Sequence, residues 1–379
     1  MLNHHLIQSY SLLLAILLLF LANISIGQSL ETAANQVAEW QYHSEKTYDN
    51  PFREVSLSAT ITNVNTGKEI TIPAFWAGDR IWKFRFSHPE AGQYRFVTKC
   101  SDSLNQRLHQ QRGEISIAPY EGDNPVYAHG ALRVNASGDY LEHHDGTPFF
   151  WLADSWWHGM TKRLDFPRGF EQLADDRKQK GFSVIQFAIA FPCDIAPFDP
   201  RGQNAAGDPW DKDFERINPA YFDLADQRIQ MLLDKGLVPN IVGLWGYYMK
   251  YMGVENVKQH WAYLMARYGA YPVVYTLSGE TTLAYYTDLE DNWDYYKDQF
   301  RSQWSDVAQF IQENDPYNRL LTTHLGPGIH DGENPIYARQ RQTESTTTQQ
   351  LRIFTTPMLP RWAMICYCTL PKWASVRIS

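Results

Sequence analysis

The residue best placed to do chemistry in this sequence is Glu280, which ends the run 272–280 (Pro-Val-Val-Tyr-Thr-Leu-Ser-Gly-Glu). The apolar, partly β-branched first half of this run is typical of a strand buried on both faces of a parallel sheet. Ser278 and Gly279 continue a strand poorly, so Glu280 is expected at the C-terminal end of its strand, where barrel enzymes place their catalytic groups. An ordinary surface glutamate past a strand end would show the same local pattern, so the remaining strands must decide.

Polar and aromatic residues also stand where the other predicted strands end. They are Asp154, Trp156, Trp157 and His158 after the first strand, Gln186 in the second with Asp194 beyond it, Trp245 at the end of the third and His324 at the end of the fifth. Such ends meet at one rim of a barrel, which predicts a concave polar pocket with stacking walls, a shape that suits a sugar. Taken singly, each residue could instead have a purely structural role. Asp154 could cap a turn, Trp156 could pack in the core, and His324 could be a hydrogen-bonded histidine at the rim without a function.

Alternating strands and helices from residue 127 onward position these residues. The predicted strands are 148–154, 182–190, 237–245, 272–277 and 319–324, and the predicted helices are 165–180, 219–235, 255–268 and 293–314. Five such units without a glycine-rich dinucleotide fingerprint favour a (β/α)8 TIM-type barrel over a doubly wound sheet.

The region before the barrel has β signals only. Short alternating runs at 55–63, 69–76, 81–86 and 93–98, separated by turn residues, predict an immunoglobulin-like β-sandwich over residues 35–120. For Trp76 and Trp82 in this module, core or interface packing is favoured over contact with a sugar.

Several of these segments resemble one known family. They are 149–157 (Phe-Phe-Trp-Leu-Ala-Asp-Ser-Trp-Trp), 180–186 (Lys-Gly-Phe-Ser-Val-Ile-Gln) followed by Asp194, 243–246 (Gly-Leu-Trp-Gly) and the Ser-Gly-Glu ending at Glu280. Together they are similar to the apiosidase-like glycoside hydrolases, secreted bacterial barrel enzymes that act on plant-type polysaccharides. Segments 48–52 and 78–83 resemble the β-sandwich that commonly precedes such barrels, so the resemblance covers roughly residues 37–330.

The resemblance implies two catalytic carboxyl groups, Asp194 after strand two and Glu280 after strand four. Glycoside hydrolysis needs one protonated carboxyl to assist the leaving oxygen and one ionised carboxyl to attack or to activate water. A separation of about 5 Å would mean retention of the anomeric configuration, and about 6.5 to 9.5 Å would mean inversion. Which sugar is cleaved stays open.

Composition excludes several other function classes. The net charge of −8 provides no basic field for nucleic acid. Four cysteines at uneven spacing form no disulfide framework, and Cys366-Tyr-Cys368 has no zinc or redox spacing, so neither a metal nor a cofactor is expected. The aromatic share of 14% fits a carbohydrate partner.

The two ends of the chain carry their own expectations. Residues 1–27 contain a short aliphatic run followed by small residues, which predicts a cleaved signal peptide and a secreted or periplasmic protein without a membrane span; an uncleaved anchor is the alternative. The barrel is expected over 127–338 with about five of eight units, because 339–379 changes composition abruptly and resembles a frameshifted or prematurely ended reading frame. A non-catalytic carbohydrate-binding or cell-surface protein is therefore the second functional hypothesis.

Overall fold

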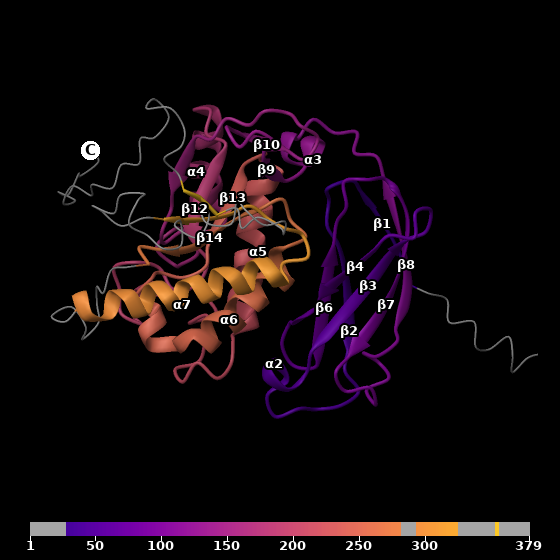
Figure 1. Ribbon diagram of the computed structural model, residues 1–379, viewed down its shortest axis with the longest axis horizontal. Helices are drawn as coiled ribbons and strands as arrows, with labels where there is room; N and C mark the ends of the chain where they lie inside the picture. Colours follow the sequence, from indigo (N-terminus) through magenta and orange to yellow (C-terminus); the bar gives the residue numbers. More distant parts are fainter. Residues whose placement is uncertain (1–27, 282–292, 325–352, 356–379) are drawn as a thin grey trace, which may run out of the picture.

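The computed structural model describes residues 28–281, 293–324 and 353–355, which form two parts lying side by side (Figure 1). The first is a β module of two sheets, and the second is a parallel sheet with helices packed around it. Helix α3 (Pro125–His129) and the hairpin of β9 (Leu132–Val134) and β10 (Leu141–His143) follow the β module. The predicted signal peptide, residues 1–27, lies outside the described residues.

Eight strands build the β module. They are β1 (Gln28–Ala33), β2 (Ala38–His43), β3 (Leu57–Asn63), β4 (Glu69–Pro73), β5 (Phe75–Trp76), β6 (Ile81–Phe86), β7 (Gly92–Cys100) and β8 (Arg112–Ala118), with the short helix α2 (Pro51–Glu54) between β2 and β3. One sheet has the order β1-β8-β7-β3-β4 and the other the order β2-β6-β5. The predicted runs are strands, but β1 begins before the predicted boundary at residue 35 and pairs parallel with β8.

Aromatic side chains join the two sheets. Trp40 of β2 stacks on Phe84 of β6 with 5.0 Å between ring centroids, and Phe96 of β7 meets these rings edge-on at 5.1 and 5.0 Å. Trp76 and Trp82 are only 7% and 3% exposed, which confirms the core reading for this pair. The immunoglobulin-like topology of the module stays a prediction.

The second part is a six-stranded, all-parallel sheet in the order β11-β12-β13-β14-β15-β16. Its elements are β11 (Ala153–Ser155), α4 (Arg168–Gln179), β12 (Val184–Ala188), the 3-10 turn η1 (Pro200–Gly202), α5 (Pro219–Asp234), β13 (Val238–Val242), α6 (Tyr248–Tyr268), β14 (Val274–Gly279), α7 (Trp293–Asn314), β15 (Leu321–His324) and β16 (Ile353–Thr355). This sequential order of parallel strands is that of a barrel, as predicted.

Two elements of the second part begin five or more residues away from their predicted starts. Strand β11 begins at Ala153 rather than at residue 148. Helix α6 begins at Tyr248 rather than at residue 255, because the helix continues on both sides of a kink at Gly253, where φ is 73°. Strand β16 lies in the segment 339–379, for which no strand was predicted, and it pairs with β15. Periodicity could not reveal a three-residue strand, because its sequence is too short to show alternation.

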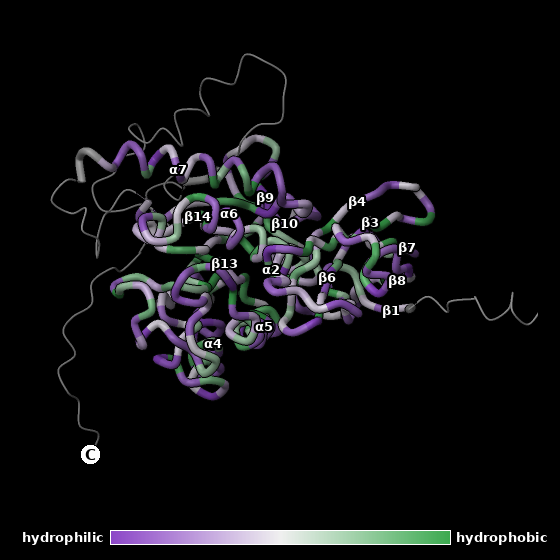
Figure 2. Tube along the Cα trace, turned by 90° about the horizontal axis from the view of Figure 1, so that it is seen from below, coloured by the Kyte–Doolittle hydropathy of each residue, from purple (hydrophilic) through white to green (hydrophobic). Residues whose placement is uncertain are grey.

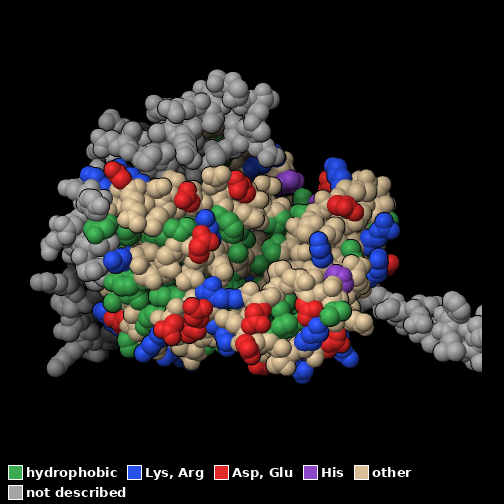
Figure 3. Space-filling view, turned by 60° about the horizontal axis from the view of Figure 1, so that its bottom comes forward, with side chains coloured by type: hydrophobic (Ala, Val, Ile, Leu, Met, Phe, Trp, Pro, Cys, Tyr) green, Lys and Arg blue, Asp and Glu red, His purple; other side chains and the backbone are tan. Residues whose placement is uncertain are grey.

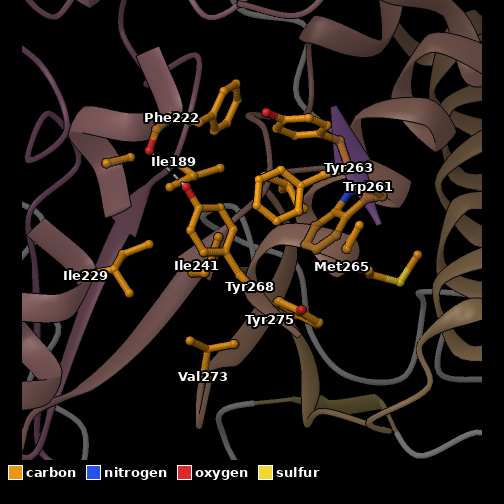
Figure 4. Close-up of a cluster of buried hydrophobic side chains, with 14 of the residues drawn as sticks. Ile189, Phe222, Ile229, Ile241, Trp261, Tyr263, Met265, Tyr268, Val273 and Tyr275 are labelled. Atoms are coloured by element: carbon orange, nitrogen blue, oxygen red, sulfur yellow. Dashed lines mark hydrogen bonds between the residues drawn. The ribbon is translucent and has the colours of Figure 1, made fainter. Parts of the chain in front are cut away.

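The strands are buried on both sides, which explains their continuous apolar runs. Every residue of β13 and of β14 is buried. Hydrophobic residues gather where β13, β14 and α6 meet (Figure 2). Figure 4 shows the side chains that fill this layer, among them Phe222 and Ile229 of α5, Trp261 and Tyr268 of α6, and Tyr275 of β14. No helix among the described residues is long and apolar enough to cross a membrane.

A buried ionic cluster fixes the β module to the helices of the barrel part. Arg85 of β6 reaches Asp226 of α5 at 2.5 Å, and Arg267 of α6 binds the same carboxylate through Nε at 2.9 Å and through Nη2 at 2.8 Å. The Tyr263 hydroxyl of α6 also donates to the carbonyl of Trp76 at 3.1 Å. Charges placed this way orient the β module on α5 and α6.

Candidate active site

Glu280 directly follows β14, at the carboxyl end of the parallel sheet, so its predicted position is confirmed. Its φ of 49° costs free energy for a residue other than glycine, and such strain is often kept at functional sites. The Glu280 backbone N–H donates to the carbonyl of His324 at 2.8 Å. Gly246 lies against the Glu280 carbonyl, where an added Cβ would come within 2.5 Å of the oxygen. The backbone of Glu280 is therefore held by two neighbouring segments.

The Glu280 carboxyl group is half-buried and contacts Trp245, whose indole N–H donates to Oε2 at 3.1 Å. Burial raises the pKa of Glu280 above its ordinary value. The hydrogen bond from Trp245 opposes that rise, and the charge of Asp194 adds to it. A carboxyl group with a raised pKa keeps its proton to higher pH, as a general acid requires.

Three aromatic rings from three different strand ends pack beside Glu280. Trp157 lies 4.9 Å from Trp245 and 5.1 Å from His324, and the last two rings are 5.6 Å apart. Trp245 is 4% exposed, whereas Trp157 and His324 are partly exposed and can line an open wall. Burial lowers the pKa of His324, which favours a neutral ring at this wall.

Asp194 lies on the loop after β12, is exposed and has a φ of 63°. The Tyr247 hydroxyl anchors this loop by donating to the carbonyl of Ile195 at 2.7 Å. Burial raises the pKa of the neighbouring Cys193 thiol, and the charges of Asp194 and Glu280 both add to that rise. Both carboxyl groups therefore act on the same small region, although they are far apart in the sequence.

Polar side chains also cross the interior of the sheet beneath this rim. Gln186 of β12 donates to the Thr276 hydroxyl of β14 at 3.2 Å, and that hydroxyl donates to Asn240 Oδ1 of β13 at 2.8 Å. The structure thus places Gln186 inside the barrel part. Asn240 and Thr276 were not predicted, and the available signal was one polar residue inside each of two buried apolar strands.

His158 belongs to the same region but is not a charged group. Burial, with a smaller contribution from Arg163, lowers the pKa of His158 to about 4, against the opposing effect of Asp194. Its Nδ1 is buried and has no hydrogen-bond partner among the described residues. A neutral imidazole near Asp194 is the result at neutral pH.

The structure does not bring Asp154 and Trp156 to the group around Glu280. Asp154 accepts hydrogen bonds from Arg177 of α4 at 2.5 Å and from the Trp156 indole at 2.8 Å. It pairs in register with Ile185, which is 0% exposed and belongs to the core. Trp156 packs edge-on against Phe170 of α4 at 5.2 Å. Successive strand residues point to opposite faces, so Ile185 points away from the interior that Gln186 enters. Asp154 and Trp156 lie on the Ile185 side, toward the helical layer.

Comparison with known protein families identifies the family of the barrel part. Residues 135–351 match the family described as "Apiosidase-like, catalytic domain", and this range covers more than half of the 379 residues. The chain belongs to the apiosidase-like family. The matched range includes Glu280, Asp194 and the three rings, and it extends past residue 339, where an aberrant tail was predicted. Residues 32–101 match a domain of unknown function, DUF5060, which covers most of the β module.

One solved structure shares its fold with most of this chain. A protein from Bacteroides vulgatus ATCC 8482, proposed to be a glycoside hydrolase, has a TM-score of 0.63 at 22% identity, with 82% of this chain and 59% of that chain covered. The chain therefore spans about three fifths of that relative. A family 5 glycoside hydrolase from the same organism (TM-score 0.42, 21% identity, 55% and 42% covered) and a family 5 mannosidase from Rhizomucor miehei (0.41, 11%, 57% and 60%) are more distant. No curated protein sequence matches significantly.

A cavity at the edge of the β module lies away from these groups of the apiosidase-like domain. Its volume is about 610 Å³, and Tyr48, Trp76, Trp82, Arg80 and Arg216 are among its lining residues. None of its lining residues stands at a strand end of the parallel sheet, and Trp76 and Trp82 are too buried to offer a stacking face. The candidate site is therefore placed at Glu280 on the basis of its raised pKa, its hydrogen bond from Trp245 and the neighbouring rings, and not on cavity size. No cluster of three or more metal-binding side chains occurs within residues 28–281 and 293–324.

Proposed function

We propose that this protein is a glycoside hydrolase that cleaves O-glycosidic bonds in plant-type polysaccharides or glycan side chains. The observation that carries the proposal is the Glu280 carboxyl group, which accepts a hydrogen bond from the Trp245 indole and has a raised pKa at the strand-end rim of an apiosidase-like domain. Family membership supports hydrolysis of a glycosidic bond, and the rim geometry supports the choice of acid.

In the proposed mechanism, Glu280 is the general acid. It donates its proton to the glycosidic oxygen as the bond to the anomeric carbon breaks. Asp194 is the second carboxyl group, and it either attacks the anomeric carbon or activates a water molecule. The shared effect of both charges on the Cys193 thiol supports this pairing.

The substrate is proposed to lie against the exposed parts of Trp157 and His324. Aromatic faces pack well on the apolar faces of sugar rings, and the lowered pKa of His324 avoids a charge there. Gln186 and His158 are proposed to contribute polar contacts from the interior and from the loop after β11. Trp245 is assigned to Glu280 rather than to the sugar, because it is 4% exposed.

The β module is proposed to be an immunoglobulin-like support for the apiosidase-like domain. Its salt bridge from Arg85 to Asp226 and the Tyr263 hydrogen bond to Trp76 support a structural role. Export through the predicted signal peptide is a further proposal.

The test is to incubate the full chain with a panel of neutral and acidic plant cell-wall oligosaccharides and to measure released sugars by chromatography. Asp194→Asn is the matched variant, because it keeps the shape of the side chain. Hydrolysis by the wild type that falls at least about 100-fold in the variant is expected. Binding without hydrolysis by the wild type would favour the alternative of a non-catalytic carbohydrate-binding protein.

The same products decide the stereochemistry. Proton NMR of the first product formed distinguishes the retained from the inverted anomer. Retention would mean that Asp194 and Glu280 lie about 5 Å apart in the working enzyme, and inversion would mean about 6.5 to 9.5 Å.

A further inference from the structure

We propose that Trp245 is a positioning residue that determines which oxygen of Glu280 carries the catalytic proton, an inference that rests on the proposed function. The Trp245 indole N–H donates to Oε2 of Glu280 at 3.1 Å. An indole N–H can donate but cannot accept, so Oε2 must offer it a lone pair. The carbonyl oxygen of a carboxylic acid is a better acceptor than its hydroxyl oxygen, so the hydrogen bond at Oε2 favours the acidic proton on Oε1, and the proposal directs Oε1 toward the glycosidic oxygen.

The surroundings of Trp245 keep its N–H in this position. The ring is 4% exposed, and it lies against the backbone of Gly279, where an added Cβ would come within 2.5 Å of a ring carbon. The rings of Trp157 and His324 pack against other parts of it. Rotation of the Trp245 side chain would break all of these contacts, so the donor is fixed before substrate binds.

The same hydrogen bond serves the reaction. As the C–O bond breaks, its electron pair stays on the leaving oxygen, which takes the proton from Oε1, and Glu280 becomes a carboxylate. The donor on Oε2 then bonds to a full negative charge, which strengthens the hydrogen bond. Within residues 28–281 and 293–324, the ionisable groups beside Glu280 are Asp194, Cys193 and His324. Asp194 is repulsive toward the new charge, and the other two favour their neutral forms.

The first test does not depend on activity. In the full chain labelled with ¹⁵N-tryptophan, the Trp245 indole resonance is identified by its loss in Trp245→Phe and is followed against pH. We expect it to shift as Glu280 titrates and to lose that shift in Glu280→Gln. An indole resonance of Trp245 that is the same at all pH values in the wild type would overturn the proposal, and the wild type and Glu280→Gln alone suffice to see this if Trp245→Phe misfolds.

The second test is kinetic. Trp245→Phe should lower kcat about tenfold with little change in KM, and should move the alkaline limb of the pH–rate profile to higher pH, because the lost donor stabilised the carboxylate. Trp261→Phe is the matched control, since Trp261 is equally buried and its Nε1 has no partner among the described residues. An unchanged alkaline limb in Trp245→Phe would contradict the proposal. If no substrate is hydrolysed, the proposed function fails, and the NMR titration still decides the role of Trp245.

Discussion

Glu280 and Asp226 are both partly buried carboxyl groups, yet their charged and polar neighbours differ in kind. Asp226 is 18% exposed and lies between Arg85 and Arg267. Burial raises its pKa, but the two guanidinium groups outweigh burial and lower it to about 2. Among the described residues, the side-chain donor to Glu280 is the neutral indole of Trp245, the like charge of Asp194 lies nearby, and the pKa of Glu280 is raised.

Burial alone therefore does not make a carboxyl group an acid catalyst. Asp226 stays ionised across the physiological range, and with Arg85 and Arg267 it forms an ionic cluster that links the β module to α5 and α6. No ion pair to Glu280 occurs among the described residues, and its raised pKa favours retention of a proton that can be transferred. The surface charge offers no such distinction, since acidic and basic side chains are interspersed on both parts in the face shown in Figure 3.

The largest expected effect concerns Glu280. Glu280→Gln keeps the shape and removes the transferable proton, so kcat should fall about 10²- to 10⁴-fold. At neutral pH the variant should be as stable as the wild type or more stable, because the raised folded-state pKa of Glu280 makes the wild type lose stability as pH rises through that pKa. Kinetics and thermal melting of the same preparation test both statements. A variant with more than about half of the wild-type turnover would contradict the role of Glu280.

The next largest effect concerns the ionic cluster of Arg85, Asp226 and Arg267. Arg267→Met removes one of the two cations from Asp226 and the partner of Asp223, and should cost about 3 to 5 kcal/mol of unfolding free energy, because the buried Asp226 carboxylate keeps only Arg85. The matched control is Arg133→Met, whose salt bridge to Glu142 uses a side chain that is 52% exposed and should matter by about 1 kcal/mol or less. Urea unfolding measures both. Equal losses would mean that burial adds nothing to the cluster.

Low pH should weaken the same ionic cluster, because Asp226 becomes protonated. A folded pKa of about 2 against an ordinary 3.8 is a difference of about 1.8 units, or roughly 2 kcal/mol at 1.36 kcal/mol per unit. This stability is present above pH 4 and is lost as pH falls toward 2. The difference in unfolding free energy between the wild type and Asp226→Asn should therefore shrink by that amount over this interval. A constant difference would show that the two arginines do not hold the pKa down.

Prediction from the sequence worked where a signal is local. The strand and its Ser-Gly-Glu ending fixed the position of Glu280, and helix α7 was predicted with the bounds that it has. The features that the sequence did not reveal depend on residues far apart in the chain. The hydrogen bond between Trp245 and Glu280 and the placement of Asp226 between two arginines require knowledge of which segments pack together. Pattern reading along one strand cannot supply that knowledge.

Asp154 also has a partner that its own strand does not reveal, and it gives the smallest expected effect. It was predicted to bind substrate because it ends a strand, but its side chain pairs with Arg177 of α4, and both side chains are about a quarter exposed, at 27% and 25%. Asp154→Asn should therefore cost about 1 kcal/mol or less of stability and leave kcat/KM within about twofold. Trp157→Ala, three residues further on, should lower kcat/KM about tenfold by removing a ring from the proposed sugar wall. Measuring both variants on one substrate separates the two faces of the same strand end. A larger kinetic loss for Asp154→Asn than for Trp157→Ala would mean that the ion pair opens when substrate binds and that Asp154 turns toward the rim.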